Sequence, residues 1–388
     1  MGIKYPVCLR AYVRTGAKAE EVASMNGLTV ILHILLLFFY KPTAKRPKIL
    51  LEDKAFPSDH LCCGISDPVE QSMLFMKPRP GEEVLRAEDI LDTIEKEGDS
   101  IAVVLFSGVQ CYTGQFFDMV AITKAGQKKG CYVGFDCAHA VGNAELKLHD
   151  WGVDFACLCS YKVSIGVCVA KSRQMNCWQW LHSVSCPTPA DTGRQQYYVN
   201  SGAGGLAGAF IHEKNTHTVK PALTGWWGHN LKTRFRMDNE IDLLPGISGF
   251  RLSNQPILLV CPLQASLELS IFRTSIAALR KKSRLLTGYL ECLIQHYYNK
   301  DESQPHKPYV HIITPSHPEE RGCQLSLSFS VPIAAVFQEL EKRGVACDMR
   351  EPNILRIAPV PLYNSFSDIH RFITVLGSSL AASKELQE

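Results

Sequence analysis

The stretch from Cys131 to Lys162, CYVGFDCAHAVGNAELKLHDWGVDFACLCSYK, decides the fold class. It holds two apolar runs, at 131–136 and 153–160, and a more polar connection between them. Continuous apolar runs of this length are typical of strands that are covered on both faces of a sheet. Both runs are followed or ended by polar residues, so we predict two buried strands whose ends carry polar side chains.

The sequence on either side extends this pattern. Residues 101–108 (IAVVLFSG) and 204–213 (GGLAGAFIHE) predict two further strands, whereas 85–98 and 119–130 have the spacing of amphipathic helices. Strands that alternate with helical segments indicate parallel βαβ units. The expected fold class is therefore α/β, with a mainly parallel sheet in a large domain.

The texture changes after about residue 260. We predict one long helix over 263–298, strands at 309–315 and 322–331, a helix at 333–344, a strand at 354–365 and a last helix from about 366. This order predicts a smaller carboxyl-terminal α+β domain. The expected organisation is an atypical leader at 1–13, a large domain at 14–260 with an insertion at 163–197, and a small domain at 261–388.

Composition narrows the classes of function. The net charge is +3, from 41 basic and 38 acidic residues, and no basic stripe with interleaved aromatic residues suggests a nucleic-acid surface. The most apolar segment, 28–40, is shorter than the about 20 residues of a membrane-spanning helix, so we expect a buried helix there. The 15 cysteines lack paired zinc-site spacing. We expect reduced thiols, no metal site and a cytoplasmic location.

The strand ends carry the candidate chemistry, because ligands of parallel α/β sheets lie beyond the carboxyl ends of the strands. Ser107, Asp136 and Lys162 each follow or end an apolar run, and His139 comes shortly after Asp136. Taken singly, such an aspartate could be a helix cap and such a lysine a solvated surface group.

Together these side chains fit pyridoxal phosphate, which forms a Schiff base with a lysine and pairs its pyridinium nitrogen with a carboxylate. Asp136 and Lys162 would take these two parts, and His139 could stack on the ring. The phosphate needs N–H groups and hydroxyls at a helix start. Thr29 and the polar turn at 56–60 could supply them.

With these residues in place, the chain resembles kynureninase. The resemblance is carried by MNGLTV, AFPSDH, LFSGVQCYTGQ, GCYVGFDCAHAVGN, LHDWGVDFACLCSYK, GAGGLAGAFIHE, GWWGH, FRLSNQPIL and LRIAPVPLYNSF. It implies a homodimeric, cytosolic, pyridoxal-phosphate-dependent enzyme of the aspartate-aminotransferase fold type, with its active site at the dimer interface. Such enzymes hydrolyse the Cβ–Cγ bond of kynurenine or 3-hydroxykynurenine to an anthranilate and L-alanine, in tryptophan catabolism toward NAD.

The resemblance also implies roles for individual residues. Lys162 would be the Schiff-base lysine and Tyr161 its acid/base neighbour, while Arg356 would bind the substrate α-carboxylate. The implied cofactor-binding residues are Leu28, Thr29, Phe56, Pro57, Ser58, Asp59, Ser107, Asp136, His139, Tyr161, Lys162, Trp226 and Asn254. Of these, Trp226 and Asn254 match positions that the family uses across the dimer interface.

The sequence departs from the family in three important places. A short, unrelated leader stands where the family has a long further segment, LCCGISDPVEQ at 61–71 is shorter than and unlike the family's helix there, and 163–197 intervene directly after Lys162. We interpret this insertion as a translated intron, because Val163–Ser164 and Gln195–Gln196 can be encoded by splice-site sequences. A genuine surface insertion is the alternative. We expect little activity from this form, since the insertion disturbs the turn that aims the lysine.

Two other functions stay open on the sequence alone. One is a catalytically impaired isoform that only dimerises or binds, which the missing amino-terminal segment and the insertion favour. The other is a different enzyme of the same fold type, such as a cysteine desulfurase or an aminotransferase.

Overall fold

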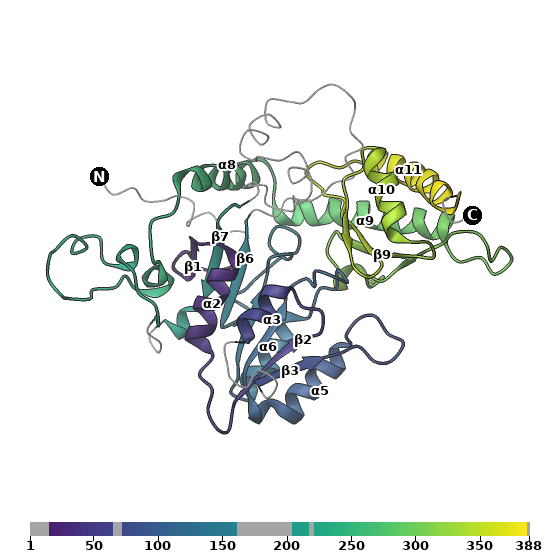
Figure 1. Cartoon of the computed structure of the whole chain (residues 1–388). Coiled ribbons are helices and arrows are strands. Elements are labelled where there is room, and N and C mark those ends of the chain that lie inside the picture. Colours follow the sequence, from purple (N-terminus) through teal and green to yellow (C-terminus); the bar gives the residue numbers. More distant parts are fainter. Residues whose placement is uncertain (1–14, 65–71, 161–203, 217–220, 386–388) are drawn as a thin grey trace. The chain divides into compact units, whose positions relative to one another are not determined.

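The computed structural model describes residues 15–64, 72–160, 204–216 and 221–385. They form two compact units (Figure 1). The first contains the described residues up to Cys111, those of 116–160 and those from 204 to Ile276, and the second contains Tyr112–Gln115 and those from Ala277 onward. The predicted leader at 1–13 and the predicted insertion at 163–197 lie outside the described residues.

The first unit is built on a seven-stranded sheet with the order β1-β7-β6-β5-β4-β2-β3. Strands β2 to β6 pair in parallel, which confirms the predicted α/β class, whereas β7 runs antiparallel to both β6 and β1. The strands are β1 Val22–Met25, β2 Lys48–Glu52, β3 Met73–Met76, β4 Ile101–Ser107, β5 Tyr132–Asp136, β6 Phe155–Cys159 and β7 Ala207–Ile211.

Helices cover both faces of this sheet. Val103 and Leu105 of β4 belong to the core that surrounds helix α2, whereas Val104 between them lies beside Gly126 of α6. Because successive side chains of a strand point to opposite faces, α2 and α6 lie on opposite sides. The helices of the unit are α2 Leu28–Phe39, α3 Pro57–Cys63, α5 Ala87–Glu97, α6 Met119–Lys128 and α8 Ile257–Arg273.

The apolar segment at 28–40 is the buried helix that we predicted. Phe39 of α2 stacks on Phe155 of β6, with ring centroids 4.4 Å apart. The neighbouring strand makes room for the Phe155 ring with Gly134, where an added Cβ would lie 2.1 Å from that ring. Among the described residues, no helix has the length and apolar character needed to cross a membrane.

The second unit holds an antiparallel four-stranded sheet with the order β10-β11-β9-β8, as expected of an α+β domain. The predicted long helix over 263–298 is wrong: Thr274 is extended (φ −160°, ψ 165°) and ends α8 before α9 begins. The elements are α9 Ile276–Tyr298, β8 Val310–Ile312, β9 Leu325–Phe329, α10 Ile333–Lys342, β10 Asp348–Arg350, β11 Ile354–Ile357 and α11 Phe366–Glu385.

Candidate active site at the carboxyl ends of the parallel strands

Polar side chains end three neighbouring parallel strands of the first unit. Glu52 ends β2, Ser107 ends β4 and Asp136 ends β5, and all three are buried. Ser107 and Asp136 are register partners. Because the strands run in parallel, their carboxyl ends lie along the same side of the sheet. The fold thus brings the ends of β4 and β5, which the sequence singled out, together with the end of β2, which it did not.

The loops after β4 and β5 hold Asp136 in place. Its Oδ1 accepts a hydrogen bond from the Ala138 N–H at 2.7 Å, and its carbonyl oxygen accepts one from the Gly108 N–H at 2.7 Å. Asp136 is 5% exposed and His139, in the following turn, is 4% exposed. A buried carboxylate and a buried imidazole therefore lie just beyond the strand ends.

Two helix starts bring hydroxyl groups together. Thr29 lies in the first turn of α2 and Ser58 in the first turn of α3, and their hydroxyl oxygens are 2.9 Å apart. Leu28 begins α2, Pro57 begins α3 and Phe56 precedes it as the N-cap residue. The N–H groups of a first helical turn have no partner within their own helix, so such a place suits an anion.

Electrostatics links α3 to the strand ends. Burial raises the pKa of the Cys62 thiol to about 12, and the negative charges of Asp59 and Asp136 add to the shift. The pKa of Cys157 on β6 is raised well above its ordinary value by burial first and then by the same two carboxylates. Asp59 and Asp136 therefore act on the same two thiols, which stay protonated.

The remaining predicted residues lie elsewhere or outside the described residues. Tyr161 and Lys162 come directly after Ser160, where the description of the chain stops until residue 204. Trp226 is 47% exposed and Asn254 is exposed, both between β7 and α8. Among the described residues, no hydrogen bond or ring contact joins either of them to Ser107 or Asp136.

Arg356 belongs to the second unit. It lies on β11 and forms an ion pair with its register partner Asp348 on β10. Arg350 lies 3.2 Å from the same Asp348 carboxylate oxygen. Because Arg356 is only 4% exposed, Asp348 compensates a buried positive charge.

Sequence reasoning missed one residue of the strand-end group, Glu52. It ends the run KILLE at 48–52, of which Ile49, Leu50 and Leu51 are fully buried. This is the same pattern, an apolar run ended by a carboxylate, that singled out Asp136. The signal was present in the sequence.

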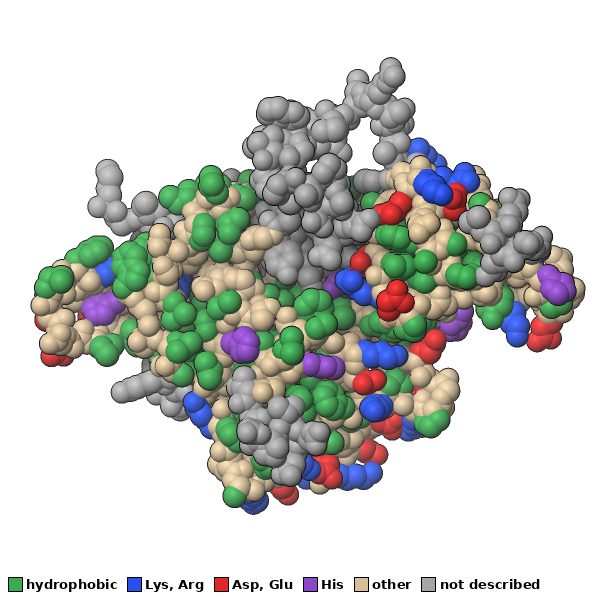
Figure 2. All heavy atoms as spheres, in the orientation of Figure 1, with side chains coloured by type: hydrophobic (Ala, Val, Ile, Leu, Met, Phe, Trp, Pro, Cys, Tyr) green, Lys and Arg blue, Asp and Glu red, His purple; other side chains and the backbone are tan. Residues whose placement is uncertain are grey.

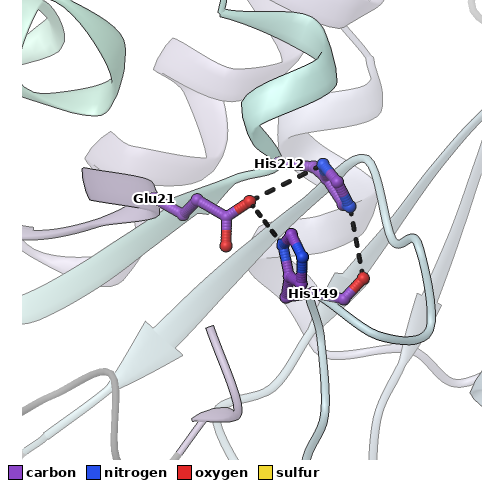
Figure 3. Close-up of side chains that lie close together, drawn as sticks. All are labelled: Glu21, His149 and His212. Atoms are coloured by element: carbon purple, nitrogen blue, oxygen red, sulfur yellow. Dashed lines mark hydrogen bonds and ion pairs between the residues drawn. The ribbon is translucent and has the colours of Figure 1, made fainter. Parts of the chain in front are cut away.

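A separate cluster joins Glu21, His149 and His212 (Figure 3). Glu21 Oε1 lies 2.9 Å from His149 Nδ1 and 3.6 Å from His212 Nδ1, and the two imidazole rings stack with centroids 4.7 Å apart. The Lys214 N–H donates to His212 Nδ1, and the Lys18 N–H donates to Glu21 Oε2. These side chains could also hold a metal ion, but the hydrogen bonds give the cluster a structural role by themselves. We therefore read the cluster as a clasp that fastens the start of β1 to two loops.

Comparison with known proteins places the chain. Residues 279–376 match the profile of the kynureninase C-terminal domain, and 77–183 match that of aminotransferase class V. Human kynureninase is 60% identical over 95% of this chain and 73% of its own length, and the mouse enzyme is 58% identical over the same shares. Kynureninase of Nematostella vectensis is 48% identical over 94% of this chain and 72% of its own length.

This chain belongs to the kynureninase family. As a member, it is a pyridoxal-phosphate-dependent hydrolase that cleaves a carbon–carbon bond of kynurenine. The buried carboxylate of Asp136 and the paired hydroxyls of Thr29 and Ser58 fit that cofactor, since its ring nitrogen is a cation when protonated and its phosphate is an anion.

Solved structures share the kynureninase fold at low sequence identity. A cysteine desulfurase from Thermococcus onnurineus superposes with a TM-score of 0.69 at 15% identity, covering 97% of this chain and 83% of its own. The cystine lyase C-DES gives 0.70 at 15% identity, covering 96% and 84%. These likenesses show the fold alone, so the desulfurase alternative gains no support beside the 60% identity to a kynureninase.

Proposed function

We propose that the carboxyl ends of β4, β5 and β6 form the kynurenine-cleaving site of this chain, with its cofactor between them and the starts of α2 and α3. Asp136 pairs with the ring nitrogen and keeps it protonated. His139 lines the ring, and Lys162 holds the cofactor through its amine. The observation that carries the proposal is the buried Asp136, in register with Ser107 at the strand ends.

The hydroxyls and helix starts would hold the phosphate. Thr29 and Ser58 present adjoining hydroxyl oxygens, and Ser107, the last residue of β4, is proposed as a third contributor. The other residues proposed to line this side of the cofactor are Leu28, Phe56, Pro57 and Asp59. Bound cofactor supplies an electron-accepting ring, and the chain's residues orient it and move protons. Lys162 and Tyr161 would be the acid/base groups, and Arg356 would bind the substrate carboxylate with its planar guanidinium.

Turnover of kynurenine tests this assignment. Asp136→Asn removes the negative charge but keeps the phosphate contacts. In a form of the chain that hydrolyses kynurenine to anthranilate and alanine, we expect turnover to fall on the order of a hundredfold or more, with cofactor content within about twofold. Asp150→Asn, at an exposed acidic position in the loop after β5, is the control. Near-normal turnover of Asp136→Asn would remove Asp136 from the site.

We further propose that two copies of the chain associate through the segment 221–258. Hydrophobic side chains gather on this segment, at the left of Figure 2. The most exposed are Phe235 (79%), Met237 (100%), Ile241 (75%) and Leu258 (86%). Such a cluster favours a covered interface in the working protein. Trp226 and Asn254 lie within it, so a second copy could bring them to its partner's cofactor.

The oligomeric state tests the dimer. Light scattering after gel filtration should give twice the mass of the chain, and Phe235→Glu should shift it toward the monomer. Leu285→Glu alters an exposed leucine of the second unit and should leave the dimer intact. A monomeric unsubstituted chain at micromolar concentration contradicts the proposal. We also propose that the chain works in the cytoplasm, where its 15 cysteines, which follow no paired framework, would stay reduced.

A further inference from the structure

Glu52 is a buried acidic group beside the proposed cofactor site. It ends β2, which lies next to β4 in the sheet, and it is 1% exposed. Both of its carboxylate oxygens accept from the Ser107 N–H, at 3.1 and 3.2 Å. Among the described residues, no lysine, arginine or histidine forms an ion pair with it. A buried carboxylate whose described hydrogen-bond partner is a neutral N–H group is costly, which suggests a purpose beyond packing.

The hydrogen bonds from Glu52 lead directly to Asp136. Glu52 fixes the last N–H of β4, and the next N–H, that of Gly108, donates to the Asp136 carbonyl oxygen at 2.7 Å. Ser107 is also the register partner of Asp136. Hydrogen bonds thus link the end of β2 to that of β4, and the end of β4 to that of β5. The position of Ser107 and Asp136 therefore depends on Glu52.

The charge of Glu52 also reaches Asp136. Burial raises the pKa of Glu52 to about 7, hydrogen bonds from Ser107 oppose that shift, and the negative charge of Asp136 adds to it. On the other side, Glu52 contributes to the raised pKa of Cys63 on α3. Within the described part of the chain, the titratable groups that act on Glu52 are therefore Asp136 and the Cys63 thiol, which stays neutral. An ionised Glu52 would add a second negative charge near a cation held by Asp136.

We propose that Glu52 is a positioning residue of the cofactor site, which fixes the end of β4 through Ser107 and supplies a second buried acidic group beside Asp136. The inference rests on the proposed function, because Ser107 and Asp136 must contact the cofactor. It predicts two separable effects. Geometry depends on an acceptor at position 52, whereas the electrostatic effect depends on a carboxylate there.

Two substitutions separate these effects in the full chain. Glu52→Gln keeps an oxygen that can accept the Ser107 N–H but cannot ionise, and Glu52→Ala removes both. Glu88→Gln and Glu88→Ala, at an exposed position of α5 in the same unit, are the matched controls. The measurements are the dissociation constant of pyridoxal phosphate, hydrogen exchange of peptides that span 101–110 in the apoprotein, and the pH titration of the bound cofactor's absorbance.

We expect Glu52→Ala to weaken cofactor binding about tenfold or more, the loss of a hydrogen bond to a charged group, and to speed exchange at the end of β4. Glu52→Gln should bind within about threefold of the unsubstituted chain. It should also move the midpoint of the absorbance titration to lower pH by about half a unit or more, since a nearby negative charge is lost. The Glu88 variants should change none of these.

The outcomes distinguish this inference from the function on which it rests. If borohydride fixes the cofactor on Lys162 but Glu52→Ala binds it normally, or Glu52→Gln titrates like the unsubstituted chain, the role of Glu52 is wrong. If Glu52→Ala does not fold, the titration of Glu52→Gln decides. If the unsubstituted chain fixes no cofactor on Lys162, the proposed function itself has failed.

Discussion

At the scale of single residues, the proposed site contains two buried acids at the ends of parallel strands. Asp136 and Glu52 end strands that are one strand apart in the sheet, and Ser107 lies between them. The N–H of Ser107 serves Glu52, whereas the N–H of Ala138 serves Asp136. Burial raises the pKa of Glu52 to about 7, which is near neutral pH. Its protonation should therefore show in the stability of the protein.

The pH dependence of unfolding follows from that pKa. In the folded chain the pKa of Glu52 is raised from 4.5 to about 7, so its proton is held more tightly than after unfolding. The stabilising contribution is complete below pH 4.5 and is lost as the pH rises through 7. Between pH 6 and 8 the loss should be about 1 kcal/mol.

Thermal or urea unfolding of the apoprotein at pH 6 and pH 8 measures this loss. Glu52→Gln should lose less stability than the unsubstituted chain over that interval, because the amide does not ionise. The Glu88→Gln variant should follow the unsubstituted chain. Equal pH dependence in all three would show that Glu52 does not titrate in this range.

At the scale of elements, the local sequence pattern predicted strands β4, β5, β6 and β7 of the large sheet, but not β2 or the edge strands β1 and β3. Strands β4, β5 and β6 are covered on both faces, so each appears as a continuous apolar run. The outer strands β1 and β3 are short. Strand β10 has only three residues, Asp348–Arg350, of which the middle one is apolar and the other two are charged. Such short strands leave no periodic signal.

The local sequence pattern also failed to predict the pairing direction of β7 and the break between α8 and α9. Strand β7 is apolar like the parallel strands β4, β5 and β6, but it runs antiparallel to β6. Its direction is set by how the chain returns to the sheet, which composition does not record. The break between α8 and α9 falls at Thr274 and Ser275, within an otherwise helical spacing. Likewise, the proposed site residues Asp136 and Ser107 were predicted from the ends of apolar runs. That they are register partners could be seen only in the folded sheet.

The contribution of the Glu21 clasp to the stability of the first unit can be tested. Glu21 is fully buried and accepts from the Lys18 and Glu213 N–H groups while bonding His149. Glu21→Ala should reduce the free energy of unfolding by about 2–3 kcal/mol, because buried donors lose their acceptor. Glu20→Ala, at the exposed neighbouring position, should change it little. Chemical denaturation of both variants makes the comparison. A loss for Glu21→Ala no larger than for Glu20→Ala would contradict the clasp.

At the scale of the whole molecule, the family membership predicts an active enzyme, whereas the segment after Lys162 predicts low activity. The chain is 60% identical to human kynureninase over 95% of its length, and yet 163–197 follow the proposed catalytic lysine directly. Catalysis depends on the position of that lysine, and a displacement of about 1 Å can cost on the order of a hundredfold in rate. The segment should therefore decide how active the chain is.

Removal of 163–197 tests this expectation. A chain that joins Lys162 to Tyr198 should hydrolyse kynurenine on the order of a hundredfold faster than the full chain. Lys162→Ala in the shortened chain should abolish that gain, which assigns it to the lysine. Transcripts sequenced across the junction would show whether the segment is a translated intron. Equal turnover by the two chains would mean that the segment is a tolerated surface insertion.

The central claim is that the cofactor is held at the strand ends through Lys162. The most direct test is to saturate the full chain with pyridoxal phosphate, reduce it with borohydride and map the labelled peptide by mass spectrometry. We expect the pyridoxyl group on Lys162, which comes two residues after Ser160 in the sequence. Label on another lysine, with none on Lys162, would contradict the account.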